Sequence, residues 1–113
     1  MSLRVVLAGA DDGDVAAALD DAGADVRRVD GIATRKSLAA AGIETADVFL
    51  LTDMDDATAI SVAKDANADV RVVTYATDSL PEFARGQADL AIDPDLLTPD
   101  VVAEELVDGR VEG

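Results

Sequence analysis

Residues 5–19 decide the fold, and they read VVLAGADDGDVAAAL. The apolar run over residues 5–8 predicts a buried strand, and the small apolar residues over 15–19 predict a helix. The glycine-containing loop between them, residues 9–14, completes the strand–loop–helix unit with which nucleotide-binding α/β domains begin. That loop carries three aspartates at the place where a phosphate would bind. This stretch therefore predicts more about the fold than about the activity.

The alternation of strand and helix continues along the chain. The apolar runs predict five strands, at residues 4–8, 25–29, 47–52, 70–75 and 89–92. The periodic stretches predict helices at residues 14–22, 35–41, 57–66, 80–85 and 99–107. The expected N-caps of the first three helices are Asp12 or Asp14, Thr34, and Asp55 or Asp56, and that of the fourth is Ser79. Gly23 is expected to end the first helix in a left-handed conformation.

This pattern predicts a single α/β domain over residues 1–113. Its core would be a doubly wound, five-stranded parallel sheet in a Rossmann-like three-layer sandwich. Right-handed crossovers make the strand order 2-1-3-4-5 the simplest one. A sheet of this kind binds its ligand where the strand order reverses. We therefore expect a crevice between strands one and three, above Gly9, Thr52 and Asp53.

The chain carries 24 acidic and 9 basic residues, which give a formal net charge of −15 at pH 7. The acids recur in nearly every turn, so we interpret the excess as the adaptation of a cytoplasmic protein from a salt-loving organism. In about 1 M salt the Debye length is about 3 Å, and self-repulsion is largely screened. An acidic surface for a basic partner is the alternative. No basic patch could replace the counterions of DNA or RNA, so nucleic-acid binding is not expected.

Cysteine and histidine are both absent from the sequence. Disulfides and zinc–thiolate sites are therefore excluded, and Ser61 and Ser79 have no histidine that could activate them. An enzyme is the function class that we expect least. No stretch approaches 18 consecutive apolar residues and no signal peptide precedes the first strand, so we expect a cytoplasmic location without membrane insertion. Residues 1–3 and 112–113 look like additions made for expression.

The glycine loop departs from the dinucleotide-binding fingerprint G-x-G-x-x-G, whose second glycine lets the pyrophosphate approach. Gly9 occupies the first glycine position, but Asp11 and Asp14 occupy the second and third. One exposed carboxylate about 4 Å from a phosphate costs about 1 kcal/mol, and more where it is partly buried. Three interpretations stay open. The acids cap the helix, or they hold a cation that bridges to phosphate or solvent, or they belong to a nucleotide site that tolerates them.

Asp30 is a further candidate, 21 residues after Gly9 at the end of the second strand. An acid at that place in a dinucleotide-binding domain hydrogen-bonds the ribose. An aspartate before Gly31 is equally typical of a residue that begins a turn. We keep both interpretations.

Two further stretches carry a resemblance to a known family. They read DGIAT over residues 30–34 and AAGIETADVFLLTDMDDAT over residues 40–58. Together with residues 70–73 and 91–94, they resemble the N-terminal nucleotide-binding domain (TrkA-N, or RCK) of the Trk-type potassium-uptake regulators. Relative to that family, one helix–strand unit between the ribose acid and the G-D-A-T motif looks deleted.

The resemblance implies a non-catalytic regulatory domain linked to potassium transport. Its cofactor would be NAD or ATP, with binding that is weak or lost, and its partner would be a membrane transporter subunit. By position, the cofactor-binding residues would be Gly9, Ala10, Asp11, Asp30, Thr52 and Asp53. A homodimer through sheet-edge or helix surfaces is compatible with the sequence.

Two alternatives need no nucleotide. Strand order 2-1-3-4-5 is also that of phosphoacceptor receiver domains, and Asp11-Asp12 resembles their acidic metal-binding pair. Thr52 lies where we place the phosphoacceptor, with Asp53 one residue later, and Asp93 stands where such a domain has a lysine. This pattern suggests a degenerate receiver-like signalling domain. The second alternative is a structural or partner-binding domain whose nucleotide site has decayed.

Overall fold

Apolar strands build a five-stranded parallel sheet in the computed structural model, which describes residues 3–9, 15–29, 33–53, 57–76 and 88–112. The strands are β1 Arg4–Ala8, β2 Asp25–Arg28, β3 Val48–Leu51, β4 Arg71–Tyr75 and β5 Leu90–Ile92. Their order is β2-β1-β3-β4-β5, and every neighbouring pair is parallel. The predicted sheet and its strand order are confirmed.

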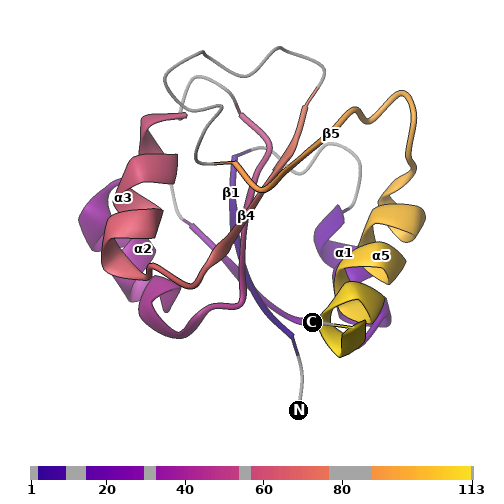
Figure 1. Ribbon diagram of the computed structural model, residues 1–113, viewed down its shortest axis with the longest axis horizontal. Helices are drawn as coiled ribbons and strands as arrows, with labels where there is room; N and C mark the ends of the chain where they lie inside the picture. The colour runs from indigo at the N-terminus through magenta and orange to yellow at the C-terminus, as the bar shows by residue number, and fades with distance from the viewer. Residues whose placement is uncertain (1–2, 10–14, 30–32, 54–56, 77–87, 113) are drawn as a thin grey trace.

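Helices cover both faces of this sheet (Figure 1). One face carries α1 Val15–Asp21 and α5 Pro99–Glu112. The other carries α2 Arg35–Ala40, the 3₁₀-helix η1 Ile43–Thr45 and α3 Thr58–Ala66. The sequence pattern does not predict η1, and it ends α5 too early; the helix expected after Ser79 falls outside the described residues. Across the residues that the structure describes, no helix has the length and apolar character needed to cross a membrane.

Side chains of the central strands point alternately to the two faces, as the pleat of a strand requires. Phe49 belongs to the same buried cluster as Ile60 of α3, whereas Leu50 belongs to the cluster that contains Leu106 of α5. All four side chains are at most 1% exposed. The edge strand β2 has no fully buried residue and carries Arg27 and Arg28. Charged residues on an edge strand oppose pairing with another chain.

The cap of α2 agrees with the sequence prediction. Thr34 Oγ1 accepts a hydrogen bond from the Ser37 amide at 3.2 Å, and Ser37 Oγ accepts one from the Thr34 amide at 2.8 Å. This reciprocal pair satisfies two N–H groups at the start of the helix. By contrast, Ala57 is the N-cap of α3 and makes no side-chain cap. The caps that we expected for α1 and α3 lie outside the described residues.

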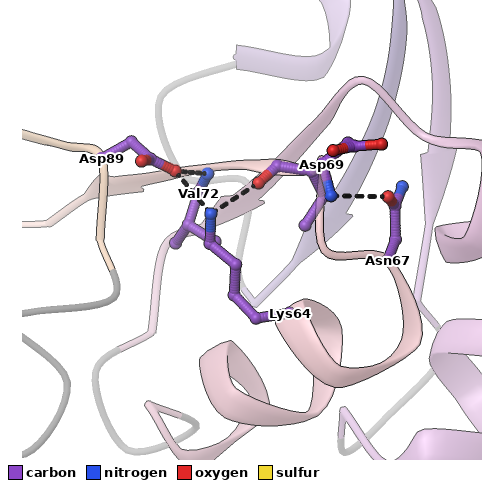
Figure 2. Close-up of polar contacts among 6 residues, drawn as sticks. Lys64, Asn67, Asp69, Val72 and Asp89 are labelled. Atoms are coloured by element: carbon purple, nitrogen blue, oxygen red, sulfur yellow. Dashed lines mark hydrogen bonds and ion pairs between the residues drawn. The ribbon is translucent and has the colours of Figure 1, made fainter.

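One lysine and one aspartate tie the start of β5 to α3 and β4 (Figure 2). Lys64 Nζ lies 3.0 Å from Asp89 Oδ2 and donates a hydrogen bond to the Val70 carbonyl at 2.8 Å. Asp89 Oδ2 also accepts a hydrogen bond from the Val72 amide at 2.8 Å. Burial raises the pKa of Asp89, but the hydrogen bonds from Val72 and Lys64, with the charges of Lys64 and Arg71, outweigh it and lower the pKa.

The start of β1 is held in a similar way. The Arg4 amide donates a hydrogen bond to Asp47 Oδ2 at 2.9 Å, and the Leu3 carbonyl accepts one from the Asp25 amide at 2.7 Å. Leu3, which we set aside as an addition made for expression, is 3% exposed and belongs to the core beneath α1 and α5. It is therefore part of the packed structure.

Candidate functional site

The loops after β1 and β3 meet at Gly9, Thr52 and Asp53, as the strand order predicts. Gly9 has a φ of +102°, a conformation that residues with a side chain rarely adopt. A Cβ atom placed on Gly9 would collide with Thr52 Oγ1 and would lie 2.9 Å from the Asp53 amide nitrogen. The two loops therefore approach so closely that only glycine fits between them.

Thr52 and Asp53 present different groups at this edge of the sheet. The amide of Thr52 donates a hydrogen bond to the Ala8 carbonyl at 3.0 Å, and its hydroxyl donates to the same carbonyl at 3.3 Å. The threonine is half-buried, whereas Asp53 is exposed. The carboxylate that reaches solvent after β3 is thus that of Asp53, and the hydroxyl of Thr52 faces back toward β1. The placement of Thr52 at the acceptor position of a receiver-like site stays a prediction, with Asp53 as the exposed acid beside it.

The remaining predicted site residues, Ala10, Asp11 and Asp30, lie outside the described residues. Their roles as cofactor-binding residues stay predictions. The same holds for Asp12, the second member of the acidic pair. Within the part of the chain that is described, no group of three or more acidic, histidine or cysteine side chains is arranged to hold a metal ion.

The ends of β4 and β5 complete the carboxyl edge of the sheet. The Ala76 amide donates to the Ile92 carbonyl at 3.2 Å, and Asp93 follows directly. Asp93 Oδ1 accepts a hydrogen bond from the Asp95 amide at 2.9 Å, and its carbonyl accepts from the amides of Leu96 and Leu97 at 2.9 and 3.1 Å. Asp93 is therefore the first residue of a tight turn, and it places a negative charge directly after β5, where we expected a receiver domain to have a lysine.

Basic side chains are absent from the described residues that directly follow the five strands. These residues are Gly9, Val29, Thr52, Ala76 and Asp93. With Asp53 next to Thr52, the described residues that follow the strands carry two carboxylates and no cation, while Arg28 is the last residue of β2 itself. An anionic ligand, such as one with a carboxylate or phosphoryl group, is stabilised by positive charge or N–H donors in its binding site. The two carboxylates after the strands therefore do not favour such a ligand.

Two cavities lined by described residues lie away from Gly9 and Asp53. One, of about 210 Å³, lies at the amino ends of β1 and β2 beside η1, where Arg4, Asp25 and Thr45 line it. The other, of about 340 Å³, lies between β5 and α5 and is lined mainly by apolar side chains. Sequence analysis missed the second cavity. The adjacent pair Leu96-Leu97, inside a run of acidic residues, was the signal that could have indicated it.

Residues 5–106 match the model of a protein family described as a family of unknown function (DUF7126). The chain belongs to this family. No curated protein matches it.

Solved structures with a similar fold include response regulator receiver domains and a pilus assembly-related protein. A CheY-like response regulator receiver domain protein from Methanospirillum hungatei has a TM-score of 0.71 at 19% identity, over 99% of this chain and 96% of that one. An atypical orphan response regulator, described as having a phosphorylation-independent regulatory mechanism, has a TM-score of 0.70 at 16% identity, over 97% and 96%. A pilus assembly-related protein from Burkholderia pseudomallei has a TM-score of 0.68 at 18% identity, over 97% and 90%. The fold is therefore receiver-like.

These matches overturn the resemblance to the TrkA-N domain, which is wrong. The sheet matches receiver domains along nearly the whole chain, so no helix–strand unit is missing from it. The classification as an NAD-binding regulator of potassium transport is wrong for the same reason. The motifs misled because a glycine loop after β1 and an acid after β3 lie at the ligand-binding edge of many parallel α/β sheets.

Proposed function

We propose that the chain is a non-catalytic, receiver-like signalling domain of the cytoplasm that acts on a partner protein without being phosphorylated. The observation that carries this proposal is Asp93, which begins the turn after β5 and supplies an anion instead of a cation. The atypical orphan response regulator with the same fold, described as phosphorylation-independent, supports it by analogy.

The charge at this edge supports the absence of phosphorylation. A phosphoryl group on Asp53 would add about two negative charges to an edge that already carries Asp93. The described residues after the strands provide no cation in return, and the whole chain has a net charge of −15. Like charges at short range cost about 1 kcal/mol each in water and several times more where solvent is excluded. An acyl phosphate at Asp53 would therefore be poorly stabilised.

Incubation with acetyl phosphate and Mg²⁺, followed by intact-protein mass spectrometry, tests the proposal. The chain and its Asp53→Asn variant should both keep their unmodified mass, because neither stabilises the phosphoryl group. A phosphoryl adduct on the chain that is absent from Asp53→Asn would contradict the proposal. A known receiver domain treated in parallel confirms that the reagent is active.

A second experiment separates this function from nucleotide binding. Calorimetric titration with NAD, NADH, ATP and ADP in molar potassium chloride should give no heat of binding. Saturable binding of any of the four would contradict the proposed function, since a receiver-like domain of this kind does not need a nucleotide.

A further inference from the structure

The exposed large apolar side chains of the described residues gather in one place. Leu96 is 80% exposed, Leu97 36% and Val101 37%, and all three line the cavity between β5 and α5. We call this surface the β5–α5 groove; its lining residues are Leu90, Ala91, Ile92, Asp93, Leu96, Leu97, Val101 and Glu105. Single exposed apolar residues are normal on a protein surface, whereas exposed apolar residues that gather together are a feature of interaction sites.

The turn that carries Leu96 is fixed by hydrogen bonds. The amides of Leu96 and Leu97 both donate to the Asp93 carbonyl, and the buried Tyr75 donates its hydroxyl to the Leu97 carbonyl at 2.8 Å. Burial raises the pKa of Tyr75, so the hydroxyl keeps its proton at neutral pH. Leu96 is therefore held outward by a fixed backbone. A partner that covers it would not have to order this turn, which lowers the entropic cost of binding.

The charged residues in and next to the groove are acidic in the described part of the chain. Asp93 and Glu105 line it, and Asp95, Asp100 and Glu104 stand in the same turn and in α5. No lysine or arginine occurs among residues 88–107. Among the described residues, the surface thus combines an apolar centre with acidic side chains. The partner that fits it carries apolar side chains flanked by lysine or arginine.

We propose that the β5–α5 groove is a docking site for a basic amphipathic segment of a partner protein. This proposal rests on the proposed function, since it names the surface through which an unphosphorylated receiver-like domain would reach its partner. A second copy of the chain fits the groove less well. A two-fold interface places the same patch opposite itself, so Asp93 and Glu105, which line the groove, would face like charges.

A synthetic helical peptide of leucine and lysine, about 14 residues long, is a suitable probe because its two faces match the groove and its acidic side chains. Fluorescence anisotropy of the labelled peptide should show saturable binding. Leu96→Ser should weaken that binding at least ten-fold, and Glu105→Gln should weaken it two- to three-fold. Glu44→Gln removes the same charge from η1, on the opposite face of the sheet, and should leave the affinity unchanged. Leu96 is mostly exposed, so an unchanged melting temperature will confirm that the variant folds.

Several outcomes would overturn the proposal. If a peptide of the same composition but scrambled order bound equally well, net charge alone would account for the binding and the amphipathic face would have no role. If the wild-type chain and Leu96→Ser bound the peptide equally well, the peptide would not bind in the β5–α5 groove. A dimer in light scattering that Leu96→Ser dissociates would make a second copy the occupant. None of these results depends on Asp53. A result that refutes the docking site is therefore distinguishable from a result of the acetyl phosphate experiment that refutes the proposed function.

Discussion

The two edges of the sheet use aspartate in opposite ways. At the amino edge, Asp47 and Asp89 each accept a hydrogen bond from the backbone amide of a neighbouring strand, and Asp89 also pairs with Lys64 (Figure 2). At the carboxyl edge, Asp53 is exposed and Asp93 accepts a hydrogen bond within its own turn. The amino edge therefore joins strands through its carboxylates. The carboxyl edge carries negative charge with no basic residue among the described residues that directly follow the strands.

This difference separates the residues that hold the fold from those that would carry chemistry. An Ala-Asp dipeptide stands at the start of β2 and ends within two residues of the start of β3, β4 and β5, in Ala24-Asp25, Ala46-Asp47, Ala68-Asp69 and Ala88-Asp89. Two of these aspartates bond to a neighbouring strand, so part of the large acidic excess has a structural role. Acidic composition alone does not reveal that role.

The largest expected effect is at the carboxyl edge, where Gly9 separates two loops. Gly9→Ala should lower the free energy of unfolding by about 3 kcal/mol, because the positive φ and the contact with Thr52 Oγ1 add their costs. Gly23→Ala is the matched control. Gly23 has a φ of +97° but nothing within 4 Å of an added Cβ, so Gly23→Ala should lower the free energy of unfolding by only about 1 kcal/mol. Equal losses in urea unfolding would show that the close approach of the loops has no energetic weight.

The amino edge gives the next largest effect. Asp89→Ala leaves the buried Val72 amide without its acceptor and removes the partner of Lys64, which should cost about 1–2 kcal/mol. Asp69→Ala changes the exposed aspartate of a neighbouring Ala-Asp dipeptide and should change stability by less than about 0.5 kcal/mol. Chemical denaturation of both variants compares them directly. If Asp69→Ala proved as harmful as Asp89→Ala, the strand-joining role of Asp89 would be refuted.

The smallest effect concerns pH. The pKa of Asp89 is lowered in the folded chain, so the stability that its charge contributes is fully present above the pKa of the unfolded chain, near 4. It is lost as the pH falls through the folded pKa. The Asp89 side chain is 44% exposed, so this part amounts to less than about 1 kcal/mol. The difference in unfolding free energy between the chain and Asp89→Ala should stay constant from pH 7 to 5 and shrink below pH 4. A difference that grows in acid would contradict this assignment.

Sequence reasoning predicted the sheet because its signals are local. Runs such as residues 48–51 are apolar at every position, which is typical of a central parallel strand, and Thr34 lies directly before a helical stretch. The order of the strands followed from crossover handedness. The short helix η1 lacks a periodic pattern, since three residues are too few to show one.

The site was harder to predict because its geometry depends on contacts between distant residues. The Arg4–Asp47 hydrogen bond spans 43 positions, and that between Tyr75 and Leu97 spans 22. The proximity of Gly9, Thr52 and Asp53 could be predicted only from the strand order, which places the ends of β1 and β3 side by side. It could not assign the family, because the motifs after Asp30 describe turns that several parallel α/β folds share.

The ¹⁹F NMR spectrum of the chain with beryllofluoride and Mg²⁺ tests the central claim most directly, because this complex mimics a phosphoryl group on a carboxylate. With Asp93 in place of a cation, we predict only the resonances of free fluoroberyllate species, both in dilute buffer and in molar potassium chloride. A bound resonance in the chain that disappears in Asp53→Asn would contradict the account, because it would show that this acidic edge stabilises a phosphoryl group after all.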